Sequence, residues 1–312
     1  MKRLLFYAVV CASSSICEAQ EIETETAERT TFSSTAKPRK GSYLQYGQPL
    51  IEDNSFLIEE AINQEAGVIQ HIFATTYSAG DIVYSYTQEL PLRDDRHQLS
   101  FGLSYAALKK PDAMTPIAQS NYVSSGMGDF MINYRSMLWD KNDWAIVIPR
   151  LSLIIPTGNA RYHLGAGAWG GQFNLAVTKR LSRRLVTHYN AGYTYYSSSD
   201  YYRYDKDLNP TLTYEKDIDI ATVGASAVWL VHPKFNMLLE YVSSFEEEIL
   251  DDASVVCQHN LTVNPGIRMA FDIGKVQVVP GVGVPFTFEN GQYVAAGAFI
   301  YLSIEPAYAS ED

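Results

Sequence analysis

The sequence predicts an all-β protein: a transmembrane antiparallel β-barrel of about 12 strands, preceded by a short N-terminal helix. From Gly67 to Glu305, segments of about ten to sixteen residues alternate apolar and polar side chains, as expected where one face of a strand meets lipid and the other meets water. Very short connections and longer polar connections alternate between these segments. After the N-terminus no apolar run reaches the about 18 residues of a transmembrane helix.

The first residues have the features of an export signal. Lys2 and Arg3 precede an apolar run, and Ala19 offers a small residue for cleavage. Residues 20–48 are mostly polar, acidic at first and rich in Thr, Ser and Lys, which is typical of disorder. The expected organisation is a signal peptide at 1–19, a disordered periplasmic tail at 20–48, a short helix at 49–66, the barrel at 67–305 and a C-terminal tail at 306–312.

Composition excludes some functions. The net charge is −11, whereas proteins that bind nucleic acid carry a basic patch, so nucleic acid is not an expected partner. Cys257 stands alone after signal cleavage, which leaves no internal disulfide. The acidic run at 246–252 lacks the ordered ligand spacing of a calcium site. No metal or cofactor is predicted.

A short amphipathic segment precedes the first strand. Asp53 to Ser55 offer N-cap chemistry, and apolar residues then recur near helical spacing. One interpretation is a helix that packs against the periplasmic end of the barrel, and the other is a plug or gate. The residues that would form the plug are Phe56, Ile58, Glu59 and Ile62.

Twelve strands follow from the alternation. The third is the clearest, since Leu99, Phe101 and Leu103 alternate with Ser100 and Gly102. The expected strands are 68–78, 81–90, 97–108, 128–139, 143–156, 171–181, 184–197, 217–231, 234–246, 259–273, 275–288 and 292–305.

The connections sort by length. Tight turns are expected near 140–142, 182–183, 232–233 and 274–275, and long loops at 109–127, 157–170, 198–216 and 247–258. Outer-membrane barrels have short periplasmic turns and longer external loops. We therefore expect both termini in the periplasm, a location in the bacterial outer membrane, contact with its lipid, and help from periplasmic chaperones and the barrel-assembly machinery during export.

Ionisable residues in the polar phase are candidates for the lumen lining. With a turn near 140–141, Arg150 is expected across from Met131, away from Arg135. These arginines would either form a ladder that steers anionic solutes or pair with acidic residues and fill the lumen. The full set of lumen candidates is Glu89, Arg135, Arg150, His188, Glu240, Arg268 and Asp272.

Aromatic residues gather in one expected outer loop. Tyr201, Tyr202, Tyr204 and Tyr214 lie there with Asp and Lys between them. Such amphipathic rings would either catch aromatic or lipidic solutes or form the upper girdle of the membrane-spanning band. Catalysis is not predicted, because no nucleophile motif surrounds His188, Ser226 or Asn236.

Several short motifs resemble a known family in their order along the chain. These are Gly128-Asp129-Phe130, Pro156-Thr157-Gly158, Trp169-Gly170-Gly171-Gln172, Asn190-Ala191-Gly192-Tyr193 and Pro265-Gly266-Ile267-Arg268. They are similar to motifs of the outer-membrane proteins grouped as the phenol meta-pathway-degradation-like family. The resemblance implies a transport barrel that passes hydrophobic small molecules.

Two functions follow. The first is an outer-membrane channel or transporter that admits small, hydrophobic or aromatic molecules by passive diffusion. The alternative is a structural or surface-interaction barrel with a filled lumen and no transport.

Overall fold

The computed structural model describes residues 44–45, 48–49, 55–92, 95–109, 122–141, 145–204, 210–249 and 254–306. The expected signal peptide lies outside these residues, as does most of the expected periplasmic tail. Within that part of the chain, β1 (Leu44–Gln45) pairs with β2 (Gln48–Pro49). The expected C-terminal tail also lies outside the described residues, except for Pro306, which ends the last strand.

The chain forms a closed antiparallel barrel of twelve passes, as the alternation predicted. Four passes are interrupted by one or two residues and therefore contain more than one strand. The first six passes are β3 (Gln70–Ser78), β4 (Asp81–Pro91), β5 (His97–Lys109), β6 (Tyr122–Met127) with β7 (Phe130–Ser136) and β8 (Trp139–Lys141), β9 (Ala145–Ile155) and β10 (Gly170–Ser182). The other six are β11 (Leu185–Tyr204), β12 (Pro210–His232), β13 (Phe235–Ile249), β14 (Val255–Met269) with β15 (Phe271–Ile273), β16 (Val276–Gly283) with β17 (Phe286–Glu289), and β18 (Gln292–Ala296) with β19 (Ala298–Pro306).

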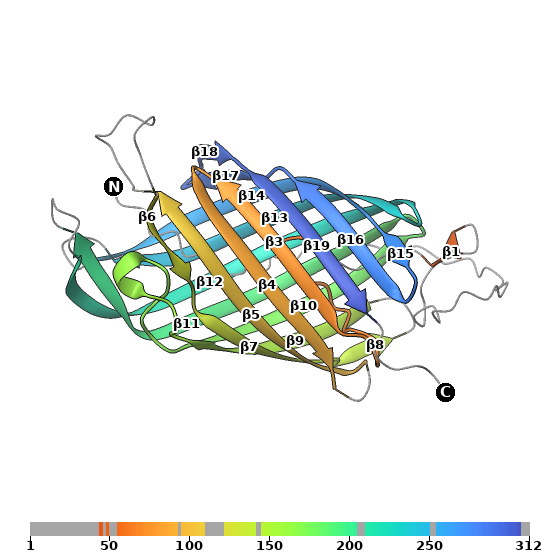
Figure 1. Cartoon of the computed structure of the whole chain (residues 1–312), viewed down its shortest axis with the longest axis horizontal. Helices are drawn as coiled ribbons and strands as arrows, with labels where there is room; N and C mark the ends of the chain where they lie inside the picture. The colour runs from red at the N-terminus through yellow and green to blue at the C-terminus, as the bar shows by residue number, and fades with distance from the viewer. Residues whose placement is uncertain are drawn as a thin grey trace, which may run out of the picture.

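The barrel closes where β19, the last strand, pairs with β3, the first strand of the wall (Figure 1). Burial alternates along the strands: in β10, Gln172 and Asn174 are buried while Phe173 is exposed. A polar inner face and an apolar outer face are the expected arrangement for a barrel in lipid. No helix among the described residues is long and apolar enough to cross a membrane.

Two expected long loops are largely strand. β11 has 20 residues and β12 has 23, so most of 198–216 continues the ladder beyond a membrane-spanning length. Likewise β13 and β14 take up most of 247–258, since Ile249 pairs with Val255. The loop expectation was wrong because charged residues interrupt the apolar phase there, while Tyr, Thr and Val still favour extended backbone.

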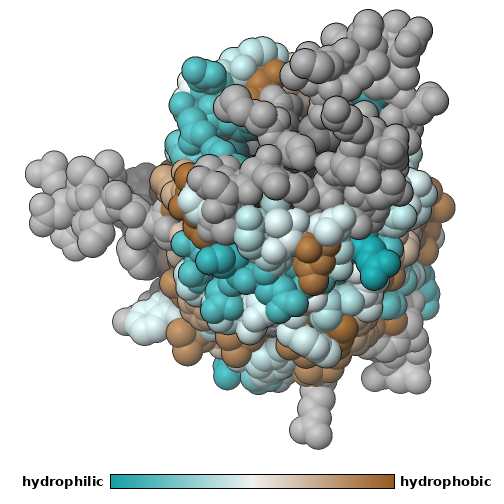
Figure 2. All heavy atoms as spheres, turned by 90° about the vertical axis from the view of Figure 1, so that its left-hand side faces the viewer, coloured by the Kyte–Doolittle hydropathy of each residue, from teal (hydrophilic) through white to brown (hydrophobic). Residues whose placement is uncertain are grey.

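At this end of the barrel, which we call the loop end, the connection 156–169 folds back onto the strands. It contains the short 3₁₀ helix η2 (Ala160–Tyr162). Asp129 anchors it, accepting hydrogen bonds from the backbone N–H groups of Gly158 and Ala166, both at 2.9 Å. Seen from this end, polar residues gather over the middle and apolar residues lie mainly around the sides (Figure 2).

Candidate functional site

Residues 55–64, which we call the lumen segment, lie inside the barrel. The expected helix at 49–66 is wrong over this range, because residues 55–64 form bends and irregular backbone without a helical turn. The physical reason lies in the wall: polar side chains of the barrel accept the N–H groups that a helix would satisfy internally. Thr178 accepts from Ala61 at 2.8 Å and Gln98 accepts from Gln64 at 2.6 Å. A helix this short gains little stability alone, so these acceptors determine its conformation.

Glu240 holds the start of the lumen segment. Its Oε1 accepts from the backbone N–H groups of Phe56, Leu57 and Ile58 at 2.8, 2.9 and 3.3 Å. Its Oε2 accepts from Asn264 Nδ2 at 2.9 Å. Hydrogen bonds to an ionised carboxylate are stronger than neutral ones. This fully buried carboxylate is therefore an anchor for the segment rather than a freely hydrated pore charge.

Phe56 occupies an aromatic seat in the wall. Its ring centroid lies 5.3 Å from that of Phe299 and 5.2 Å from that of Tyr301. Gly266 and Gly281 face the same ring, and a Cβ atom at either position would overlap it. Aromatic pairs of this kind contribute about 0.5–1.5 kcal/mol beyond burial. The glycines thus make room for the ring, and the aromatic pairs hold it.

Glu59 is the centre of a charged hub made with Arg135, Arg150 and Asn174. Its Oε1 lies 3.1 Å from Arg135 Nε, and its Oε2 lies 3.0 Å from Arg150 Nε. Asn174 Nδ2 donates to Oε2 at 2.6 Å. Both arginines are buried, with 2% and 6% of their surfaces exposed. Buried ions need such pairing, so the hub couples the lumen segment to the strands that supply its partners.

The remaining lumen candidates divide into two groups. Glu89 lies 3.9 Å from Arg135 Nη1, and buried His188 has its Nδ1 2.8 Å from Thr178 Oγ1. Arg268 is also buried. Asp272 does not join them, because β15 lies at the end of the barrel with the tight turns, which we call the turn end. There Asp272 is exposed and pairs with Lys234 at 3.3 Å.

The register of the two arginines differs from the expected one. Arg135 pairs directly with Arg150 across β7 and β9, so the predicted offset to Met131 was wrong. The strands turn later than expected: Lys141 pairs with Ala145. An interruption at Met137–Leu138 further changes the pairing between β7 and β8. The two guanidinium groups therefore lie side by side rather than in a ladder along the pore axis.

Near the loop end, apolar side chains form a second layer across the strands. Tyr196 and Tyr201 are buried with residues of β9, β12 and the 156–169 connection. Tyr214 stacks on Tyr201, with ring centroids 6.2 Å apart. Tyr202 is half-buried near Asp200, and Tyr204 is the last residue of β11. The buried members of the layer are Ile154, Ala166, Ala168, Tyr196, Tyr201, Ile218, Ile220 and Ile249.

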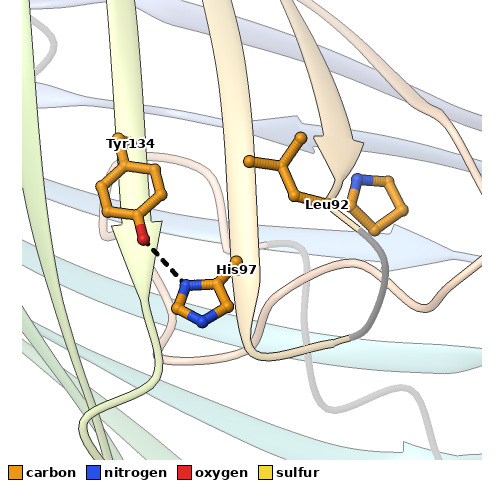
Figure 3. A pocket seen from close by; sticks show the side chains of 4 residues that line it. Leu92, His97 and Tyr134 are labelled. Atoms are coloured by element: carbon orange, nitrogen blue, oxygen red, sulfur yellow. Dashed lines mark hydrogen bonds between the residues drawn. The ribbon is translucent and has the colours of Figure 1, made fainter.

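A pocket of about 480 Å³ lies near the turn end, lined by Pro91, Leu92, His97 and Tyr134 (Figure 3). His97 Nδ1 lies 2.8 Å from the Tyr134 hydroxyl. Tyr134 belongs to the outward phase of β7, opposite to the buried Asn133 and Arg135. This pocket therefore faces the surroundings of the barrel and offers no path through the lumen.

Sequence reasoning did not single out the neutral residues that grip the lumen segment. Asn190 both accepts from the Glu59 N–H at 2.7 Å and donates to the Glu59 carbonyl at 2.6 Å. The available signal was the spacing of glycines. Gly224, Gly266 and Gly281 all fall in the inward phase, and glycine inside a strand indicates close approach of another group.

The chain is similar to known proteins in sequence and in fold. A family model described as "Putative MetA-pathway of phenol degradation" matches residues 52–236. The search of curated protein sequences gave no match.

Solved outer-membrane barrels are similar to the chain. The COG4313 outer membrane channel from Pseudomonas putida F1 aligns with a TM-score of 0.53 at 14% identity, covering 77% of this chain and 93% of that one. The KdgM porin in complex with disordered oligogalacturonate aligns at 0.44 with 6% identity, covering 77% and 99%. The translocator domain of autotransporter NalP from Neisseria meningitidis aligns at 0.46 with 11% identity, covering 79% and 90%. The closed, apolar-faced barrel lies in the bacterial outer membrane.

Proposed function

We propose that this chain, which belongs to the family described as "Putative MetA-pathway of phenol degradation", is a passive channel for small, hydrophobic or aromatic molecules. In the structure its lumen is occupied by residues 55–64, and opening requires that this segment leave.

The observation that carries the proposal is how the lumen is filled. The filling comes largely from a segment at the N-terminal side of β3, not from side chains of the wall alone. The segment is held by hydrogen bonds, by the charged hub around Glu59, and by apolar contacts such as the packing of Phe56 against Phe299 and Tyr301. Each of these contacts can dissociate without breaking a strand pair. A wall that stays intact when its filling leaves is the requirement for a gated passage.

The apolar layer near the loop end supports the choice of solute. A molecule that enters from that end meets Tyr196, Tyr201 and Tyr214 before it reaches the lumen segment. Aromatic and aliphatic side chains favour contact with apolar solutes over sugars or ions. The likeness to a solved outer membrane channel agrees with a passage through this fold.

A structural barrel without transport is the second candidate. The same filled lumen favours it, because a segment that never leaves would simply complete the core. The two functions therefore differ in one property, the reversibility of the segment.

The test is planar-bilayer conductance together with liposome permeability to benzyl alcohol. Deleting residues 20–64 should raise both relative to the full chain, and the heat-modifiable mobility of the folded barrel confirms that the variant is intact. A folded deletion variant that conducts no better than the full chain would assign the protein to the structural class.

A further inference from the structure

We propose that Arg135, Arg150 and Asn174 form a binding site for small organic carboxylates that carry an apolar group. In the structure Glu59 occupies the position of the solute carboxylate, and a carboxylate solute opens the lumen by replacing it. The inference rests on the proposed channel function and names a solute class for it.

The geometry of the hub is that of a carboxylate receptor. The two oxygens of Glu59 are divided between two guanidinium groups, at 3.1 and 3.0 Å. Asn174 adds a neutral donor at 2.6 Å. Each guanidinium group faces one carboxylate oxygen through its Nε at ion-pair distance, so the two arginines complement the charge of the carboxylate. Any molecule with a free carboxylate can make the same set of contacts.

The wall keeps this receptor in place without Glu59. Arg150 donates to Asn133 Oδ1 at 3.2 Å and to Gln172 Oε1 at 2.6 Å. Those partners lie on β7 and β10, next to the strand β9 that carries Arg150.

Arg135 donates to the Glu60 carbonyl of the lumen segment, a contact that is lost when the segment leaves. On the wall, Arg135 lies directly across from Arg150 and 3.9 Å from Glu89 on β4, so strand pairing and that carboxylate keep it beside Arg150. Leaving the two guanidinium groups without the bridging carboxylate is costly, which favours an incoming anion.

An apolar patch adjoins the receptor. Ile148 precedes Arg150 by two residues on β9, and Ala176 follows Asn174 by two residues on β10, so both face the lumen beside the hub. Ala61 of the lumen segment covers them, with Met137 and Ile146 packed alongside. When the segment leaves, this patch becomes available to an apolar group. The expected ligand therefore combines a carboxylate with a ring or short chain.

The solute carboxylate and Glu59 cannot occupy the site together, so binding of the solute favours the open lumen. A ligand that binds only the released state shifts the equilibrium towards that state. Glu59 competes as a tethered group, with an effective concentration on the order of millimolar. The solute must therefore be present at concentrations that overcome this competition.

The experiment measures benzoate binding to the refolded full chain by titration calorimetry, with benzamide as the uncharged probe. Glu59→Ala should bind benzoate about tenfold or more tightly than the wild type, because the tethered competitor is gone. Glu65→Ala, which removes the same charge just outside the lumen segment, should leave the affinity unchanged. Adding Arg150→Gln to Glu59→Ala should abolish binding, and benzamide should bind none of them.

In bilayers, benzoate should raise the open probability of the full chain, and benzamide should not. If Glu59→Ala fails to fold, the isosteric Glu59→Gln replaces it in the titration. The carboxylate site is refuted if benzoate binds the Glu59 variant no more tightly than the wild type, or if benzamide acts equally. The proposed channel fails separately, when the folded deletion of residues 20–64 does not conduct.

Discussion

Gly281 lies directly against the ring of Phe56, so an added methyl group would overlap the ring. Gly281→Ala should therefore weaken docking of the lumen segment by about 1–3 kcal/mol, the usual cost of overpacking. The measurement is open probability in planar bilayers, which should rise. Gly102→Ala is the matched control, because an added Cβ there meets only Met131 Cβ at an ordinary 3.5 Å. Equal effects of the two substitutions would show that the Phe56 seat does not hold the segment.

A second prediction for single residues concerns the folding cost of a charge on the lipid-facing and lumen-facing sides of one strand. Leu103 lies in the outward phase of β5 and its neighbour Ser104 in the inward phase. Leu103→Arg should destabilise folding into lipid vesicles by about 2–4 kcal/mol, because the charge enters lipid near the midplane. Ser104→Arg should cost less, since that face is polar. Equal losses of folding free energy would contradict the assignment of the faces.

For the elements, the lengths of the connections predict orientation. In intact cells, a membrane-impermeant thiol reagent should label native Cys257, which is exposed near the loop end. Single cysteines placed at Asp140, Arg183 or Lys275, at the turn end, should react only after the membrane is permeabilised. The reverse pattern would place the loop end in the periplasm.

The strands were predictable because period-2 alternation is a local property of the sequence, read without knowledge of the partners. The register between strands was not predictable in the same way. The pairing of Arg135 with Arg150 depends on the positions of the turn after Lys141 and of the interruption between β7 and β8. The segment before the first strand was expected to be a helix, and residues 55–64 are not helical. Its acceptors, such as Glu240 and Asn190, lie more than 100 residues away, so no local pattern contains them.

At the scale of the whole molecule, the barrel wall and the lumen segment are held by different kinds of hydrogen bond. Strand pairing closes the wall, and the hydrogen bonds that hold residues 55–64 to it include side-chain acceptors such as Glu240, Thr178 and Gln98. The predicted family is confirmed by the match over residues 52–236, which contains all the quoted motifs except Pro265-Gly266-Ile267-Arg268. Apart from Pro156-Thr157-Gly158 in the connection after β9, those motifs lie in or between strands of the wall, which explains why they indicate the fold more clearly than the state of the lumen.

In the proposed function, movement of the lumen segment opens the channel. Ser55 Oγ and Ser226 Oγ lie 3.2 Å apart, one on the segment and one on β12, close enough for a disulfide between cysteines at these positions. The measurement is single-channel conductance of Ser55→Cys/Ser226→Cys in a Cys257→Ser background. The oxidised protein should be closed, and reduction in the same bilayer should restore the activity of the Cys257→Ser parent. Identical conductance before and after reduction, with the cross-link verified by mass spectrometry, would contradict the account.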